Sequence, residues 1–250
     1  MPKVIEFANV TYSAGGRTVL HSFHLTVDDG ETLVLLGRSG SGKTTALKLV
    51  NALLLPERGP VLVDGKPTTE WDLVRLRRRI GYVIQEAGLF PHFTVRDNVA
   101  LVPTLEKWEA SRTRARVEEL LAQVGLPAGE YGARYPHQLS GGERQRTGVA
   151  RALANDPPIL LFDEPFGALD PVTRLELQKQ FLRLRDALHK TALFVTHDTR
   201  EALLVGTRIA LLSGGQLIFS GRPDEFTRSS HPEVQAFLET VATPMGIKLK

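Results

Sequence analysis

The sequence predicts an α/β fold in one large domain, with an antiparallel β layer first, a parallel sheet, and an inserted helical segment. Three observations support this prediction. Strands and tight turns fill the first third of the chain, helical signals dominate residues 94–154, and the strands that follow are almost entirely apolar. Apolar strands that alternate with helices indicate a parallel sheet covered on both faces.

The first third of the chain has the pattern of antiparallel strands. Residues 4–12 (VIEFANVTY) alternate apolar and polar side chains, and residues 19–27 (VLHSFHLTV) do so loosely. The turn residues 28–30 (DDG) precede a strand at 31–37 (ETLVLLG), and residues 59–67 (GPVLVDGKP) add a strand and a turn. These segments predict the β layer.

The middle of the chain changes to helical periodicity. A helix is predicted at 44–54 (TTALKLVNALL), directly after a glycine-rich loop at 37–42, and a short buried strand at 80–85 (IGYVIQ). Three further helices are predicted at 94–101 (TVRDNVAL), 111–125 (SRTRARVEELLAQVG) and 142–156 (GERQRTGVARALAND). We expect the helical insert to occupy about residues 88–154 of a single domain that covers residues 1–250.

The last part of the chain returns to apolar strands. They are predicted at 158–165 (PILLFDEP), 191–198 (TALFVTHD) and 208–221 (RIALLSGGQLIFSG), and a long helix at 171–190 separates the first two. Strand, helix and strand in this order are typical of a parallel sheet.

Composition excludes several classes of protein. The chain has 250 residues, 42% of them hydrophobic and 24% charged, as in an ordinary globular protein. It has no cysteine, so disulfides and thiolate metal sites are excluded. The longest apolar runs fall far below the roughly 20 residues of a membrane span. With no signal-peptide pattern at the start, we expect a cytoplasmic chain that meets the membrane only through a partner.

The net charge of +3 comes with two arginine-rich stretches, at 75–81 (RLRRRIG) and 111–119 (SRTRARVEE). Such stretches are typical of solvated faces; a docking surface for an acidic partner or for lipid headgroups is the alternative. No aromatic residues are interleaved with these arginines, so nucleic-acid binding is not supported.

Residues 37–45 (GRSGSGKTT) match the phosphate-binding pattern G-x-x-x-x-G-K-[ST]. Glycines let backbone N–H groups curl around phosphate oxygens, and a helix N-terminus adds favourable partial charge. Lys43 would reach the β- and γ-phosphates, and Thr44 would hold Mg²⁺. The alternative, a glycine-rich turn with an incidental lysine, is disfavoured because the loop follows a predicted strand and opens a predicted helix.

The segment ILLFDEP places two carboxylates, Asp163 and Glu164, at the carboxyl end of a buried strand, where open α/β sheets bind ligands. Neighbouring residues on a strand point to opposite sides, so the two carboxylates can serve different tasks. Asp163 would join the Mg²⁺ shell, and Glu164 would orient or deprotonate the attacking water. The alternative is a turn-forming acidic pair before Pro165.

Three single residues give weaker signals. Gln85 and His197 each end a predicted strand, where an amide would touch Mg²⁺ or water and an imidazole would hydrogen-bond a γ-phosphate. Tyr12 ends the first strand and would stack on a base. The alternatives are a solvated glutamine, a structural histidine and a half-buried aromatic residue of a strand.

The stretch HQLSGGERQR (residues 137–146) opens a predicted helix with a capping box formed by Ser140 and Glu143. Gly141 and Gly142 would leave the first-turn amides uncovered, which suits a second phosphate contact. Because the chain already has a phosphate loop, this turn need not face its own nucleotide. Two copies arranged head to tail would each close this turn over the γ-phosphate held by the other.

Taken in order, GRSGSGKTT, Gln85, LSGGERQ, ILLFDEP, GALD and the Thr196-His197 pair resemble the ATP-binding subunit of ABC transporters. The resemblance covers essentially the whole chain, and LSGG is its most specific part. It implies a P-loop NTPase fold with a RecA-like core, an N-terminal antiparallel β subdomain and an inserted α-helical subdomain. It also implies ATP and Mg²⁺ as cofactors and a homodimer.

The resemblance assigns roles to individual residues. For nucleotide binding it implies Tyr12 against adenine, the loop residues Gly37, Arg38, Ser39, Gly40, Ser41, Gly42, Lys43, Thr44 and Thr45, and, from the opposite subunit, Ser140, Gly141 and Gly142. Asp170 is also implied at the nucleotide site, as a contact to the opposite subunit. For the metal it implies Thr44, Gln85 and Asp163. For catalysis it implies Glu164 as the base, with His197, Gln85 and Lys43.

Two positions depart from the family pattern. Glu143 stands where the family most often has glutamine, and Gly167 replaces a commoner serine. A carboxylate facing the γ-phosphate would be unfavourable, so we expect Glu143 to point back to the Ser140 amide. We expect the change at Gly167 to matter less.

Residues 81–103 and 134–174 are similar to the ATPases of bacterial importers for osmoprotectants such as glycine betaine, choline and carnitine. The implied partners are membrane permease subunits, contacted through the loop after Gln85 (EAGLFPHFTV), and indirectly a solute-binding protein. The implied location is the cytoplasmic side of the membrane. Some of these ATPases carry a C-terminal regulatory domain, which we do not expect here because the chain ends soon after residues 220–240.

Other functions share the nucleotide chemistry. An exporter, a lipid-extraction ATPase or an importer of another solute stays open. DNA-repair and translation ATPases with the same signature carry long coiled coils or two such domains, for which 250 residues leave no room. A phosphotransferase is disfavoured because it has no use for LSGG.

Overall fold

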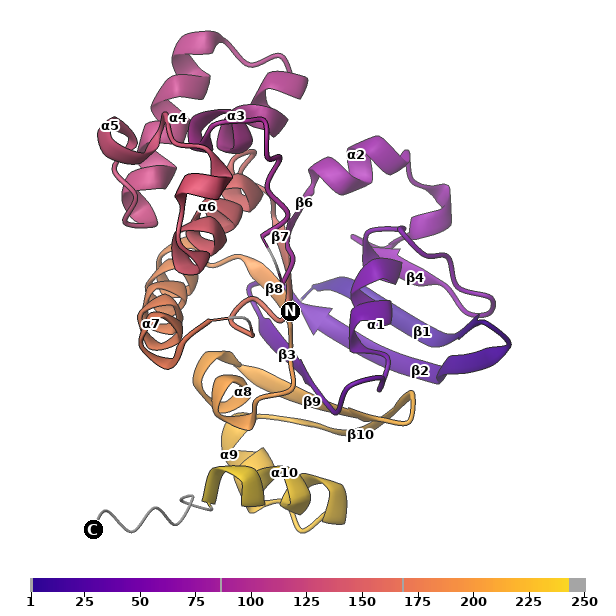
Figure 1. The fold of residues 1–250 in the computed structure, drawn as a ribbon. Helices are drawn as coiled ribbons and strands as arrows, with labels where there is room; N and C mark the ends of the chain where they lie inside the picture. The colour runs from indigo at the N-terminus through magenta and orange to yellow at the C-terminus, as the bar shows by residue number, and fades with distance from the viewer. Residues whose placement is uncertain (1, 86, 168, 243–250) are drawn as a thin grey trace, which may run out of the picture. The chain divides into compact units, whose positions relative to one another are not determined.

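The computed structural model describes residues 2–85, 87–167 and 169–242, and its elements are labelled in Figure 1. The chain divides into two compact units. The first contains the chain up to Trp71 and again from Leu193, and the second runs from Asp72 to Ala192. The predicted helical insert of residues 88–154 lies within the second unit. None of the described helices is long and apolar enough to cross a bilayer.

The first unit opens with the predicted antiparallel sheet. Its strands are β1 (Lys3–Ala14), β2 (Arg17–Asp28), β4 (Val61–Val63) and β5 (Lys66–Pro67), in the order β2-β1-β4-β5. Inward-facing residues alternate along β1 and β2 as expected for period-two strands. Phe7 and Phe23 are buried and meet edge to face, with ring centroids 5.1 Å apart. The predicted antiparallel layer is therefore confirmed for three of its four segments. The strand predicted at 31–37 is instead part of the other sheet, where its pairing is parallel.

The same unit also holds a second group of strands. β3 (Thr32–Leu36) pairs in parallel with β9 (Arg208–Ser213), and β10 (Gln216–Gly221) returns antiparallel to β9. The strand order is β10-β9-β3-β8, and β8 (Thr191–Thr196) enters this unit at Leu193. Every residue of β3 is buried, as its unbroken apolar run predicts.

Four α-helices accompany these strands. They are α1 (Lys43–Val50), α8 (Thr199–Val205), α9 (Pro223–Arg228) and α10 (Pro232–Ala242), and a 3-10 turn, η1, spans Thr68–Glu70. The helix predicted at 44–54 extends beyond the C-terminal end of the observed helix α1. It stops at Val50 because Ala52 has a left-handed backbone, with φ of 50°. Helices α8 to α10 were not predicted.

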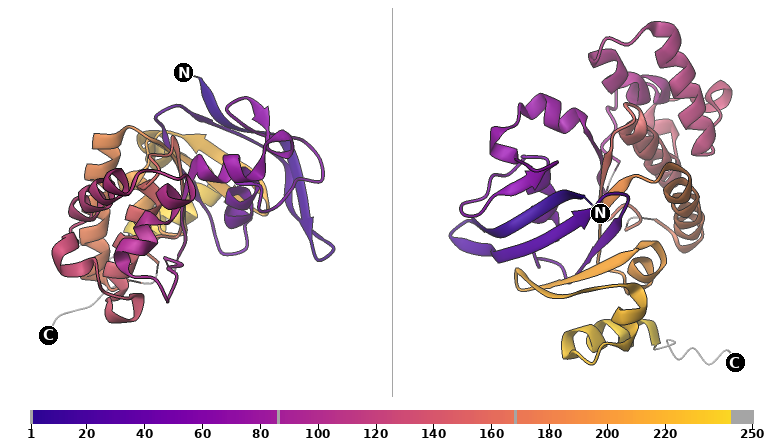
Figure 2. Two further views of the ribbon diagram at one scale, coloured as in Figure 1. Left: turned by 90° about the horizontal axis from the view of Figure 1, so that it is seen from above. Right: turned by 180° about the vertical axis from the view of Figure 1, so that it is seen from behind.

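The second unit contains one parallel pair of strands and most of the helices. β6 (Ile80–Val83) pairs with β7 (Ile159–Asp163). The helices are α2 (Leu73–Arg78), α3 (Val95–Leu105), α4 (Ala110–Gln123), α5 (Ala128–Tyr131), α6 (Gly141–Leu153) and α7 (Pro171–Leu188), and a 3-10 turn, η2, spans Pro136–Gln138. Helices α3 to α6 stay grouped in every view (Figures 1 and 2).

Local sequence explains why the predicted helices of this unit form. Thr94 caps α3, accepting a hydrogen bond from the Asp97 amide at 3.1 Å. α4 is followed by Gly125 in the left-handed region, with φ of 68°. Two predicted strands are shorter than expected: β6 ends two residues before Gln85, and β7 ends at Asp163.

Candidate functional site

The loop that joins β3 to α1 needs its glycines. Gly40 and Gly42 have left-handed backbones, with φ of 77° and 105°, and Gly42 precedes α1 without a side-chain cap. A Cβ at Gly37 would strike the Leu212 carbonyl oxygen and would lie 2.6 Å from Ser41 Oγ. The chain therefore curls tightly into α1, which begins without a side-chain cap.

Two polar groups face inward in this loop. Lys43 Nζ donates hydrogen bonds to the carbonyls of Gly37, at 2.8 Å, and Arg38, at 2.9 Å. Ser41 Oγ is buried and has no hydrogen-bond partner within the described part of the chain. An unsatisfied buried hydroxyl calls for a ligand or water. Together with the ammonium and a helix N-terminus that has no side-chain cap, it fits a phosphate group.

The remaining loop residues differ in exposure. Arg38, Ser39 and Gly40 are exposed, whereas Thr44 and Thr45, in the first turn of α1, are half-buried. The tip of the loop is thus open to solvent, whereas the two threonines at the start of α1 are partly covered by the first unit.

Strand β2 lies against the start of α1. A Cβ at Gly42 would lie 2.8 Å from Leu20 Cδ2 and 3.1 Å from the Val19 carbonyl oxygen. Leu20 is the cross-strand partner of Tyr12 on β1. Tyr12 is half-buried and lies inside β1, which runs on to Ala14 instead of ending at Tyr12. The phosphate loop and Tyr12 are therefore separated by one strand.

His197 is exposed and lies one residue beyond β8, so the prediction that it ends the strand is off by one residue. Hydrogen bonds fix the turn around it. Thr196 Oγ1 donates to Glu201 Oε2 at 2.6 Å and accepts from the Asp198 amide at 3.0 Å. Asp198 in turn caps α8. His197 thus lies in a turn that is held by side-chain hydrogen bonds on both sides of it.

In the second unit, Asp163 is the last residue of β7 and is buried. The Tyr82 hydroxyl, on the neighbouring strand β6, donates to Asp163 Oδ2 at 3.3 Å. Burial, and then the charge of Asp163, raise the pKa of Tyr82. Sequence reasoning missed Tyr82, although a tyrosine in the strand before Gln85 was a usable signal.

Glu164 lies outside the strand, in a left-handed conformation with φ of 46°. The expectation that Asp163 and Glu164 alternate along one strand is therefore wrong, because the chain turns sharply at Glu164. The Gly167 amide donates to the Glu164 carbonyl at 3.1 Å and closes this turn. A non-glycine residue in this region costs about 1 kcal/mol, which marks the position as a functional candidate.

Gln85 and Glu164 come together at Gly167. A Cβ at Gly167 would lie 3.4 Å from Gln85 Nε2 and 3.6 Å from Glu164 Oε2. Both distances are ordinary contacts, so a methyl group would fit at this position. The effect of glycine in place of the commoner serine stays a prediction. Glu86, in the loop after Gln85, and Ala168, in GALD, lie outside the described residues.

The turn before α6 has the predicted capping box. The Ser140 amide donates to Glu143 Oε2 at 2.7 Å, and the Glu143 amide donates to Ser140 Oγ at 3.2 Å. The hydrogen bond from the Ser140 amide lowers the pKa of Glu143. The prediction that Glu143 points back to the Ser140 amide is confirmed.

The two glycines of this turn have different surroundings. Ser140 and Gly141 are exposed, but Gly142 is buried, and a Cβ there would strike Thr173 Cγ2 on α7. Gly142 is therefore required where α6 and α7 approach closely. Asp170 caps α7 and accepts hydrogen bonds from the Val172 and Thr173 amides, both at 3.1 Å.

The predicted metal ligands are distributed over both units: Thr44 belongs to the first, and Gln85 and Asp163 to the second. Among the described residues, no group of three or more histidine, aspartate or glutamate side chains could hold a metal on its own. The three predicted ligands carry a hydroxyl, an amide and a carboxylate, and oxygen donors of this kind are the ligands that Mg²⁺ prefers.

Comparisons with known proteins agree with these motifs. The family model for ABC transporters matches residues 20–167. A choline transport ATP-binding protein of Bacillus subtilis is 46% identical over 235 residues, 94% of this chain and 61% of that protein. A glycine betaine/carnitine/choline transport ATP-binding protein of the same organism is 48% identical over 225 residues, 90% of this chain and 59% of that protein. The chain thus spans less than two thirds of these curated relatives.

A solved structure is also similar. It is a dimer of an ATP-binding cassette in a post-hydrolysis state, bound to ADP and Pi. Its TM-score is 0.76 at 35% sequence identity, over 88% of this chain and 98% of that chain.

Proposed function

Because the chain belongs to the ABC transporter family, we propose that it binds Mg-ATP and hydrolyses it at the interface of a head-to-tail homodimer, to power the uptake of a small solute. The observation that carries this proposal is the loop from Gly37 to Thr45. It combines left-handed glycines, an inward-facing ammonium and a buried hydroxyl without a partner among the described residues. Such a loop suits the β- and γ-phosphates of a nucleotide.

The proposed roles of the residues follow from their surroundings. Lys43 would bind phosphate oxygens in place of the Gly37 and Arg38 carbonyls, and Thr44, Gln85 and Asp163 would supply the protein ligands of the metal. Mg²⁺, when bound, neutralises charge on the phosphates. Glu164 accepts a proton from the attacking water, and its strained turn holds the carboxylate in a fixed direction.

The remaining nucleotide contacts belong to the adenine and to the γ-phosphate. Tyr12 stacks on the adenine, and His197 donates a hydrogen bond to the γ-phosphate. From the opposite copy, the Ser140 hydroxyl and the Gly141 amide of the exposed turn donate to the same phosphate, and Asp170 lies at the interface. The contacts of this turn exist only with a triphosphate, so hydrolysis reopens the dimer. A similar cassette has been solved as a dimer with ADP and Pi, which supports the dimeric arrangement.

The proposed solute is a quaternary-ammonium osmoprotectant. Two relatives with 46% and 48% identity are named for choline and for glycine betaine, carnitine and choline. We infer that permease subunits bind the loop after Gln85, that a solute-binding protein acts through them, and that the chain lies on the cytoplasmic face of the membrane. The substrate touches only those other subunits.

A dilution series tests the dimeric mechanism. The specific ATPase activity of the purified chain is expected to rise with protein concentration, and Lys43→Ala is expected to weaken nucleotide binding itself. Activity that stays constant down to concentrations without dimers would contradict the head-to-tail arrangement. Uptake of labelled choline and glycine betaine by a deletion strain, with and without the gene restored, tests the solute.

A further inference from the structure

One face of α6 contacts the segment of the chain that follows β6. Gln145, Gly148 and Arg151 are three residues apart, so they lie on the same side of the helix. Gln145 Nε2 donates to the Ile84 carbonyl at 3.4 Å. A Cβ at Gly148 would lie 3.2 Å from the Ala87 side chain, so the missing side chain makes room for Ala87. This face thus contacts the chain on both sides of Gln85, at Ile84 before it and at Ala87 after it.

Arg151 makes the strongest of these contacts. Its Nη1 donates to the Gly88 carbonyl and its Nη2 to the Ala87 carbonyl, both at 2.7 Å. Burial lowers the pKa of Arg151, but a guanidinium stays charged at neutral pH. Both hydrogen bonds are short and are strengthened by the charge of the partly buried guanidinium, and the planar fork fixes their direction. We call this pair of hydrogen bonds the clamp.

The clamped turn is one that the backbone does not favour. Ala87 and Gly88 follow each other in the left-handed region, with φ of 57° and 53°. Ala87 is buried, and a Cβ at Gly88 would strike Ile84 Cδ1. An alanine in this region persists only when its surroundings hold it there, and Gly148 and Arg151 do so.

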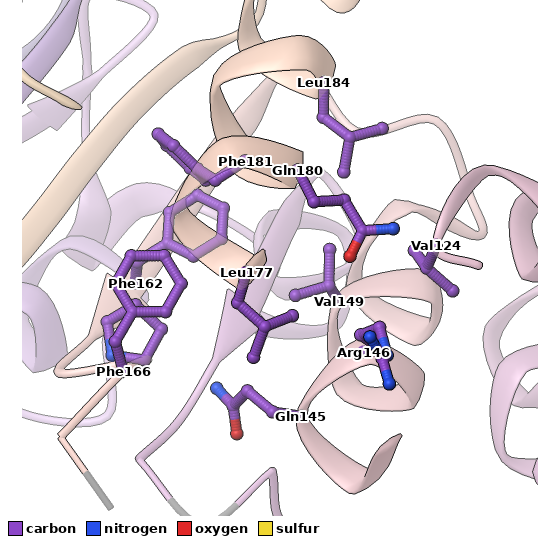
Figure 3. Close-up of a pocket in the computed structure, with 11 residues that line it drawn as sticks. Val124, Gln145, Arg146, Val149, Phe162, Phe166, Leu177, Gln180, Phe181 and Leu184 are labelled. Atoms are coloured by element: carbon purple, nitrogen blue, oxygen red, sulfur yellow. The ribbon is translucent and has the colours of Figure 1, made fainter. Parts of the chain in front are cut away.

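Helix α6 itself is firmly supported. Arg116 on α4 donates to the Leu153 carbonyl at 3.1 Å and the Ala154 carbonyl at 3.4 Å, at the end of α6. On another side, Arg146 and Val149 face α7 across a pocket that is walled by the rings of Phe162, Phe166 and Phe181 (Figure 3). The pocket holds about 20 Å³, room for about one water molecule. Helix α6 is thus held by α4 at its end and lies beside α7.

We propose that Arg151 is a positioning residue for Gln85: it ties the turn at Ala87 and Gly88 to the helix that begins at Ser140. The Gln85 segment and the Ser140 turn then move as one piece. This rests on the proposed function, in which both contact nucleotide. Loss of the clamp leaves the phosphate loop untouched and lets Gln85 drift from Glu164.

The experiment compares Arg151→Lys, which keeps the charge but loses the fork, and Arg151→Ala with wild type. Arg185→Ala is the matched control, because it removes a partly buried guanidinium of the same unit that pairs with Asp186 on α7 and not with the turn. Hydrogen exchange is measured on peptides that cover residues 84–93, and ATPase kinetics give kcat and KM. In Arg151→Ala we expect hydrogen exchange of this segment to become about tenfold faster and kcat to fall about tenfold, whereas KM stays within about twofold of wild type. Arg151→Lys is expected to fall between Arg151→Ala and wild type.

Unchanged exchange at residues 84–93, or faster exchange with unchanged kcat, would overturn the proposal, as would an equal loss of kcat in Arg185→Ala. If Arg151→Ala does not fold, Gly148→Ala approaches the same turn with Arg151 intact, and it must raise exchange there and lower kcat. If the wild-type chain hydrolyses no ATP, the proposed function fails. In that case the exchange data alone decide whether Arg151 holds the turn.

Discussion

The Tyr82 hydroxyl donates a hydrogen bond to Asp163 Oδ2 across 3.3 Å and so links strand β6 to the end of strand β7. In the proposed site Asp163 binds Mg²⁺, so the hydrogen bond from Tyr82 orients a carboxylate that is a metal ligand. Partners of this kind tune the affinity of the metal.

Tyr82→Phe is therefore expected to weaken the metal site more than the fold. The free energy of unfolding is expected to fall by about 1 kcal/mol, and the Mg²⁺ concentration for half-maximal ATPase activity to rise about threefold or more. A magnesium titration of ATPase activity and urea unfolding measure the two effects. Tyr135→Phe is the control, since that tyrosine is 41% exposed. An unchanged magnesium dependence would reduce Tyr82 to a packing role.

The same pair predicts a loss of stability in alkali. Burial and the neighbouring Asp163 raise the pKa of Tyr82 above its ordinary value of about 10. The folded protein thus holds this proton more tightly than the unfolded chain, and the stability that results is present below pH 10 and lost as the pH rises above it. The urea midpoint of wild type is expected to fall more steeply above about pH 10 than that of Tyr82→Phe. Parallel curves would contradict this.

The capping box predicts the opposite dependence at low pH. The Ser140 amide lowers the pKa of Glu143, so its contribution is present above the ordinary carboxyl pKa of about 4.3 and lost as the pH falls below it. Glu143→Gln keeps a reciprocal cap without a titrating group. Its urea midpoint is expected to match wild type at neutral pH and to change less than wild type near pH 4. Equal acid sensitivity would rule out Glu143 as the titrating group.

Glu164→Gln is expected to bind ATP normally and to lower kcat by about 100-fold or more, because the amide cannot accept the proton of water. Binding without turnover traps the closed state, so size-exclusion chromatography with Mg-ATP is expected to show a stable dimer. Nucleotide affinity serves as the internal control. Wild-type turnover in this variant would remove Glu164 from the role of base.

Gly142→Ala separates packing from nucleotide binding. The new methyl would strike Thr173 Cγ2, and overpacking of this kind costs about 1–3 kcal/mol. Thr173→Ser removes the opposing methyl and keeps the hydroxyl, so the double variant is expected to regain most of the stability in thermal unfolding. If the double variant is as stable as wild type but inactive, the bare Gly142 backbone also serves the nucleotide. If it stays unstable, the contact with Thr173 is not the cause.

Local sequence predicted much of this protein. The unbroken apolar run of β3, the glycine pattern of the phosphate loop and the capping box at Ser140 each depend on neighbouring residues, so they are visible without a structure. The residue at which each helix or strand ends was harder to predict. Helix α1 stops at Val50, and β6 ends before Gln85, because single left-handed residues and turns decide such ends.

What the sequence could not reveal depends on residues far apart in the chain. Tyr82 reaches Asp163 across 81 positions, and Arg151 reaches Gly88 across 63. Neither pairing follows from spacing or periodicity, since each arises only when helices and strands pack. Gly142 is a mixed case: its place in a known motif was visible, but its contact with Thr173 on α7 was not.

The left-handed backbone of Glu164 has a consequence for anyone who engineers this protein for heat resistance. Glycine or asparagine tolerates that conformation better, so a screen that rewards only melting temperature favours replacing this residue, with a gain of about 1 kcal/mol. Such a screen would select a sturdier protein that has lost its proposed catalytic base. Thermal robustness and turnover are set against each other at this one position.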